Sequence, residues 1–207
     1  NISIGKESLT ANTTGDSNVV VGYQAGMTNT DGNDNTLIGH KAGKTVNGGT
    51  GRNVMVGSQA GQSATTTDSS VFIGYQTAAG GVPTGDYNVA IGYQALYQLH
   101  TGAESNTSLG FRAGYSHTTG DDNTYLGANA GSGSTTASSN VAVGKDALKA
   151  AQTSSDGGQN SVLGFGAYID GTGQRLQVCC TQVWQRTPGT VASRTGGEFK
   201  INHRPSA

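Results

Sequence analysis

A short motif, Asn-x-x-aliphatic-Gly, with Ser in place of the Asn in one copy, recurs ten times along this chain of 207 residues. Successive copies begin 17 or 18 residues apart, and only the last step is longer, at 20 residues. A fixed period of this length restricts the chain to an architecture in which each unit stacks on the next, because one unit cannot bury its own apolar side chains. The copies begin at Asn1, Asn18, Asn35, Asn53, Ser70, Asn88, Asn106, Asn123, Asn140 and Asn160.

The composition supports a thin repeat protein and argues against several other classes. Glycine contributes 34 residues, and hydrophobic residues make up only 33% of the chain, which is too little for a compact enzyme with a thick core. The net charge of −1 predicts no electrostatic binding of nucleic acid. No apolar run is long enough for a membrane-spanning helix, so we expect no membrane insertion. The absence of a starting Met and of a signal peptide predicts a mature product, a fragment or a built segment.

Positions within the unit, numbered from the Asn, have distinct structural roles. Position five is Gly in all ten units, which predicts a positive φ or a close backbone approach that no Cβ permits. Position eight is Ala in eight units, which predicts tight packing there, and stacked Asn side chains at position one can form a hydrogen-bonded ladder. The predicted structural residues are Asn18, Gly22, Asn35, Gly39, Asn53, Gly57, Gly74, Asn88, Gly92, Asn106, Gly110, Asn123, Gly127, Asn140 and Gly144.

Positions two to four have the composition of a short β-strand, and the segments between them are rich in turn residues. One strand per coil, stacked about 4.8 Å apart, predicts an all-β parallel β-solenoid, or β-roll, of ten coils over residues 1–170. Position three is apolar or aromatic in eight units, and position four is aliphatic in all ten, so both strand faces are expected to be buried. A single narrow coil can cover only one face. The second face is therefore expected to meet another copy, most simply in a homotrimer.

The units NVAIG, NVVVG and NTLIG, followed by x-x-Ala-Gly or x-x-Ala-Leu, resemble the head repeats of YadA-like trimeric adhesins. They are most similar to the variant found in phage and viral tail fibres, often upstream of an endosialidase-type chaperone domain. The resemblance covers about residues 1–168. It implies a left-handed trimeric β-roll on a virion tail that attaches to host glycans or surface proteins without catalysis.

Three other functions remain open at this point. The first is a bacterial adhesin head on the cell surface, and the second is a purely structural extracellular filament. The third is an ice-binding solenoid, which the position of the Thr residues in turns rather than on a strand face disfavours.

Position six carries a row of aromatic residues, and several of them are followed by Gln. If this row faces solvent, aromatic rings with neighbouring amides would form a sugar-binding stripe. The alternative is a structural aromatic ladder at a coil corner or a subunit seam. The candidate glycan-contact residues are Tyr23, Gln24, Tyr75, Gln76, Tyr93, Gln94 and Phe111.

Residues 171–207 lack the repeat and are expected to form a small cap or a junction, because a solenoid needs its last coil covered. The segments RLQV and EFKI alternate like strands, and Trp184 is a candidate anchor if this segment is instead a receptor-binding tip. The longer segments 79–87 and 97–105 are candidate contact loops, or simply solvated turns.

The sequence predicts no enzyme, no metal and no cofactor. His40, His100, His117 and His203 have no ligand spacing, and no nucleophile, zinc or phosphate-binding motif stands in its required setting. Acidic residues recur two positions before the Asn, and we expect them to have turn and capping roles rather than to bind calcium. These recurring acids are Asp16, Asp68, Asp86, Glu104 and Asp121.

Overall fold

The computed structural model describes residues 1–47, 51–149, 159–167 and 177–179, the last three by their backbone alone. These residues form one sheet of parallel three-residue strands, arranged in chain order from β1 to β11. The strands are β1 (Ile2–Ile4), β2 (Val19–Val21), β3 (Thr36–Ile38), β4 (Val54–Val56), β5 (Val71–Ile73), β6 (Val89–Ile91), β7 (Thr107–Leu109), β8 (Thr124–Leu126), β9 (Val141–Val143), β10 (Ser161–Leu163) and β11 (Gln177–Cys179).

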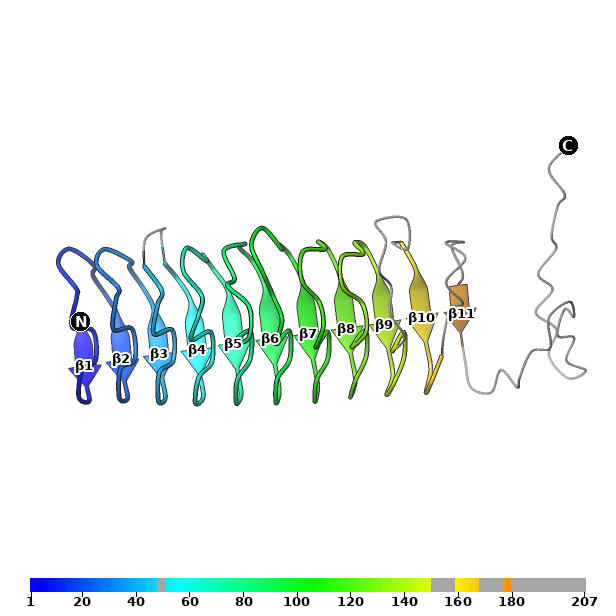
Figure 1. Cartoon of the computed structure of the whole chain (residues 1–207), viewed down its shortest axis with the longest axis horizontal. Helices are drawn as coiled ribbons and strands as arrows, with labels where there is room; N and C mark the ends of the chain where they lie inside the picture. Colours follow the sequence, from blue (N-terminus) through cyan, green and yellow to red (C-terminus); the bar gives the residue numbers. More distant parts are fainter. Residues whose placement is uncertain (48–50, 150–158, 168–176, 180–207) are drawn as a thin grey trace, which may run out of the picture.

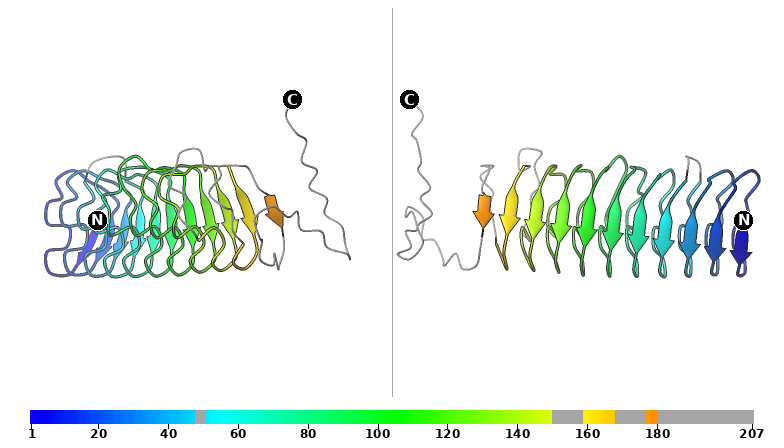
Figure 2. Two further views of the ribbon diagram at one scale, coloured as in Figure 1. Left: turned by 45° about the vertical axis from the view of Figure 1, so that its right-hand side comes forward. Right: turned by 180° about the vertical axis from the view of Figure 1, so that it is seen from behind.

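Each coil contributes one strand, and equivalent positions of successive coils pair directly, as Val20 pairs with Leu37 and Leu37 with Met55. Figure 1 shows the strands in a single row, so that the chain forms a straight rod. Figure 2 shows the loops of successive coils superposed on one another. The predicted all-β parallel β-solenoid is confirmed, and the described residues include no helix that could cross a membrane.

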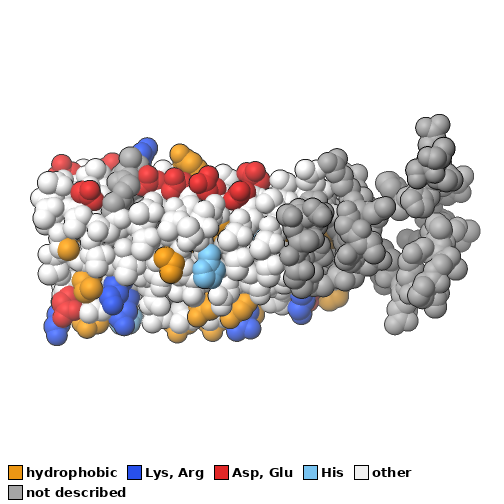
Figure 3. All heavy atoms as spheres, turned by 45° about the horizontal axis from the view of Figure 1, so that its top comes forward, with side chains coloured by type: hydrophobic (Ala, Val, Ile, Leu, Met, Phe, Trp, Pro, Cys, Tyr) orange, Lys and Arg blue, Asp and Glu red, His pale blue; other side chains and the backbone are white. Residues whose placement is uncertain are grey.

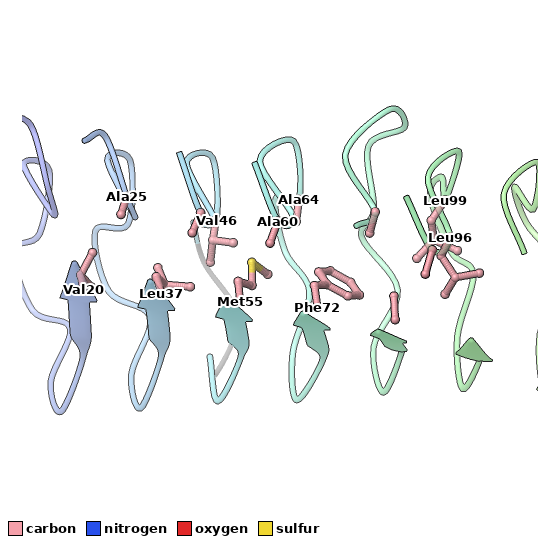
Figure 4. Close-up of a cluster of buried hydrophobic side chains, with 14 of the residues drawn as sticks. Val20, Ala25, Leu37, Val46, Met55, Ala60, Ala64, Phe72, Leu96 and Leu99 are labelled. Atoms are coloured by element: carbon pink, nitrogen blue, oxygen red, sulfur yellow. The ribbon is translucent and has the colours of Figure 1, made fainter. Parts of the chain in front are cut away.

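Position three of the unit, which is the middle residue of each strand, faces the inside of the coil. Val20, Leu37, Met55 and Phe72 are completely buried. In Figure 4 these side chains extend from their strands toward small residues on the opposite wall of the coil, such as Ala60. The predicted tight packing at position eight is confirmed, because a larger side chain there would displace the inward residue of the strand.

The repeated glycine has both features that the sequence predicts. At Gly92, φ is +132°, a conformation that L residues rarely adopt. A Cβ at this position would lie 2.4 Å from the carbonyl oxygen of Gly110 in the next coil. The equivalent glycines stack in the same way along the rod, so this column sets how closely the coils approach.

The asparagines of position one form the predicted ladder inside the rod. The Oδ1 of Asn106 accepts the backbone N–H of Asn123 at 3.1 Å and its Nδ2 at 3.0 Å. The Nδ2 of Asn106 also donates to the carbonyl oxygen of Gly120 at 2.9 Å, which closes its own coil. At Ser70 the shorter side chain keeps one link of the ladder, because its Oγ accepts the N–H of Asn88 at 3.2 Å.

The sheet continues for one strand beyond the ten that the repeat predicts. β11 pairs in parallel with β10, with Val178 opposite Val162, and covers part of the strand expected at RLQV. The repeat motif does not include this strand, because parallel pairing requires only an extended backbone, not the Asn and Gly of the repeat. The expected boundary at residue 170, the segment EFKI and Trp184 lie outside the described residues.

The outer face of the sheet carries the side chains of positions two and four, which we call the outer stripe. In the single chain only the face at position three is fully buried, whereas outer-stripe residues such as Ile38, Leu109 and Leu126 are exposed. The coil interior accommodates one side chain from each strand, so the second face has no cover within the chain. The expectation that another copy covers it stays a prediction.

Candidate functional site

The aromatic edge of the rod consists of Tyr23, His40, Tyr75, Tyr93 and Phe111 at position six. Position six follows the repeated glycine, where the chain turns away from the strand, so the turn directs each side chain outward. The four Tyr and Phe side chains are between 40% and 49% exposed. Because the coils stack in register, the rings stand above one another along the rod.

The rings of adjacent coils are stacked nearly parallel. The centroids of Tyr75 and Tyr93 lie 5.5 Å apart, and those of Tyr93 and Phe111 lie 5.3 Å apart. Tyr23 and His40 form a separate stack at 5.6 Å. A ring with a neighbour on both sides, such as Tyr93, therefore presents its edge to solvent rather than its face.

The glutamines of position seven form a second column beside the rings. The Nε2 of Gln76 donates to the Oε1 of Gln59 at 2.7 Å, and the Nε2 of Gln94 donates to the Oε1 of Gln76 at 2.8 Å. Gln24 donates in the same way to Glu7 at 2.6 Å. These amide groups bond along the rod, which explains why Gln follows the aromatic residue so often.

Arg112 joins two aromatic columns at the end of the glutamine column. Its guanidinium lies 5.4 Å from the ring centroid of Phe111 and 5.0 Å from that of Tyr115, and its Nε donates to Gln94 at 3.1 Å. Tyr115 in turn stacks on Tyr97 at 5.2 Å. The sequence motif does not single out this second column, although its members are 18 residues apart, which is one repeat.

The predicted glycan-contact residues therefore lie together on one edge of the rod. The structure places their rings in stacks and their amides in a hydrogen-bonded column. Sugars bind aromatic residues through the ring face, because the face is apolar and carries the negative side of the ring quadrupole. Most of these faces are covered by neighbouring rings, so a sugar could stack only on a ring face that remains open.

Acidic side chains gather in a row along one long margin of the rod, and hydrophobic and basic side chains gather along the opposite margin (Figure 3). Three of the acidic side chains, those of Asp68, Asp86 and Asp121, accept backbone N–H groups of the preceding coil. Asp86 accepts the N–H of Asp68 at 2.8 Å, and Asp121 accepts the N–H of Glu104 at 2.9 Å. These contacts agree with the predicted turn role, and no group of three metal-ligating residues occurs in the described ranges.

The three histidines that the structure describes do not come together. His40 belongs to the aromatic edge, His100 lies on an exposed loop, and His203 lies outside the described residues. His117 is fully buried in the coil, where its Nε2 lies 2.8 Å from the carbonyl oxygen of Gly120. Burial lowers the pKa of His117, an effect that the bond to Gly120 partly offsets.

The two longer loops, residues 79–87 and 97–105, stack on each other rather than extending freely. The backbone N–H of Gly80 donates to the carbonyl oxygen of Tyr97 at 2.8 Å, and Leu99 is fully buried. Val82 and Tyr87 remain exposed on the outside of these loops. The loops thus combine a structural contribution with an exposed apolar surface.

Comparison with protein-family models, with curated proteins and with solved structures found no match to this chain.

Proposed function

We propose that the chain is the shaft or head of a homotrimeric attachment fibre, most simply of a viral or phage tail, that binds the surface of a host cell. The observation that carries the proposal is the outer stripe. All ten of its position-four residues are aliphatic, and neither position two nor position four carries a charged residue in any of the ten repeats. Contiguous apolar surface that is exposed to water marks an interaction site, so we expect a partner to cover this stripe.

A second copy of the chain is the partner that fits this stripe best. The stripe is straight and about 43 Å long if its ten strands are spaced by about 4.8 Å. A partner must present a long, flat, uncharged surface with the same axial repeat, and an identical rod does so. The number three comes from the resemblance to the YadA-like repeats, whose heads are trimeric.

A trimeric rod is suited to attachment because it repeats its exposed surfaces. Three parallel chains would repeat each exposed edge and loop three times, and simultaneous contacts raise the overall affinity by avidity without any new contact. The aromatic edge and the loop residues Val82 and Tyr87 provide exposed apolar groups for these contacts.

Labelled protein applied to a panel of bacterial and eukaryotic cells tests the attachment. We expect saturable binding to some cells, and a weaker signal for the Ile91→Glu variant, because a charge in the outer stripe would separate the chains. Thr66→Glu, at an exposed bend outside the outer stripe, the aromatic edge and the two longer loops, is the matched control and should bind like the native chain. A native chain that binds none of the cells would contradict the attachment function and leave a spacer.

A further inference from the structure

The aromatic edge has one missing ring, at Ser58. Along position six, His40 belongs to the third coil, Ser58 to the fourth and Tyr75 to the fifth, so the serine stands where the neighbouring coils carry a ring. The backbone confirms this order. The N–H of Gln59 donates to the carbonyl oxygen of His40 at 2.7 Å, and the N–H of Gln76 donates to that of Ser58 at 3.0 Å.

The two rings beside the gap each have one covered face. His40 is stacked on Tyr23, and Tyr75 is stacked on Tyr93, in each case on the side away from Ser58. Because the coils stack in register, the opposite faces of His40 and Tyr75 are the ones directed along the rod toward Ser58. His40 and Tyr75 are exposed and Ser58 is half-buried, so this edge of the coil faces solvent.

We infer that this gap, the Ser58 slot, binds one pyranose ring of a glycan between His40 and Tyr75. The inference deepens the proposed attachment function by naming the ligand class, and it rests on that function. Two coil steps place the rings about 10 Å apart, from a spacing of about 4.8 Å per strand.

The width of the slot favours a sugar over a flat aromatic ligand. A flat ring in contact with both faces needs them only about 7–8 Å apart, because carbon atoms in contact are about 3.5–4.0 Å apart. A pyranose chair is thicker, because it is puckered and carries axial hydrogens on both faces. It would contact both rings through its C–H groups, whereas a flat ring would be loose.

The polar groups around the slot suit the hydroxyl edge of a sugar. The Oε1 of Gln59 accepts a bond from Gln76, and the Nε2 of Gln59 has no partner among the described residues. Lys41 follows His40, and its ammonium forms no ion pair within the described part of the chain. Together with the Ser58 hydroxyl, these groups supply hydrogen-bond donors to the sugar hydroxyls.

The variant Ser58→Tyr tests the slot by filling it. A tyrosine there adopts the same position as Tyr75 and Tyr93, so the fold is retained and the two stacks become continuous. Ala128→Tyr is the matched control, because Ala128 occupies position six beside Phe111 and its other neighbour is Lys145 rather than a ring. Both variants add one ring to the aromatic edge, but only the first fills the slot.

Binding is measured by saturation-transfer NMR and by titration with methyl β-glucopyranoside, methyl β-galactopyranoside and, as a flat-ring probe, benzyl alcohol. We expect at least one glycoside to bind the native chain and Ala128→Tyr, and Ser58→Tyr to lose at least tenfold in affinity. Equal binding by Ser58→Tyr, no glycoside binding by the native chain, or binding of benzyl alcohol alone would overturn the inference.

The cell assay separates this result from the proposed function. If Ser58→Tyr retains full cell binding and full glycoside binding, attachment stands and the slot is wrong. If the native chain binds glycosides and Ser58→Tyr loses this binding, but the native chain binds no cells, the slot stands and attachment is wrong.

Discussion

Replacing Asn123 by alanine should destabilise the rod at one rung of the Asn ladder. The Nδ2 of Asn123 donates to Asn106 at 3.0 Å and to the carbonyl oxygen of Ala137 at 3.0 Å. Its Oδ1 accepts the backbone N–H of Asn140 at 3.0 Å and the Nδ2 of Asn140 at 2.9 Å. The Ala137 carbonyl and the Asn140 N–H would both lose this partner in a buried environment.

The expected loss follows from these contacts. A buried donor or acceptor left without a partner costs about 1–3 kcal/mol, so the loss of two such partners in Asn123→Ala should lower the free energy of unfolding by about 2–6 kcal/mol. The Asn123→Ser variant should recover at least about 1 kcal/mol, since a serine hydroxyl can accept the N–H of Asn140. Ser70 makes this contact with Asn88 in the native chain.

Urea denaturation at a fixed chain concentration measures both variants, and hydrogen exchange at the amide of Asn140 locates the effect. Fixed concentration matters because association of chains adds to the apparent stability. An Asn123→Ala variant within about 0.5 kcal/mol of the native chain would refute the structural role of the ladder, since surface changes have effects of this size. Equal stability of the Ser and Ala variants would refute the reasoning about the hydroxyl.

Four further variants test other parts of the rod. Ser70→Asn should complete the ladder and raise the free energy of unfolding by about 1–2 kcal/mol in urea denaturation; a loss would contradict this. Gly92→Ala should lower the free energy of unfolding by about 2–4 kcal/mol in the same measurement. The loss comes from the positive φ, which alanine rarely adopts, and from the overlap of the new Cβ with Gly110 in the next coil. At Gly102 φ is +82°, but no atom lies within 4 Å of an added Cβ, so Gly102→Ala should cost only about 1 kcal/mol. Equal losses for Gly92→Ala and Gly102→Ala would disprove the role of the close approach at Gly92. Because burial lowers the pKa of His117, the unfolded chain binds more protons below about pH 6.5, so stability should fall as the pH decreases from there. His117→Asn should flatten this pH dependence of stability in thermal unfolding. Asn is the replacement because Asn29 donates to the carbonyl of Gly32, which is equivalent to Gly120. An unchanged pH dependence would show that other groups cause it.

The repeat predicts most of the fold because each position in the unit has one structural demand. Gly92 needs a backbone that only glycine provides, Asn106 needs a buried amide, and Leu37 needs the coil interior. The same demand recurs in every coil, so ten copies determine the architecture together. β11 lacks these residues, and its pairing with β10 depends on backbone geometry that the motif does not encode.

The candidate site is predicted less completely. The row of rings and amides is visible in the spacing, but the direction of their contacts is not. Gln76 and Gln94 bond to each other along the rod, and the opening at Ser58 depends on which faces of His40 and Tyr75 remain uncovered. Such details arise from side-chain geometry between coils, which the sequence of a single unit cannot show.

The mass of the folded chain in solution tests the central claim most directly. If the outer stripe is covered by copies of the same chain, sedimentation equilibrium should give about three times the 20.9 kDa of one chain, and Ile91→Glu should reduce this mass. A native chain that remains folded and monodisperse at 20.9 kDa over a wide concentration range would show that the stripe is stable in water and would contradict the account.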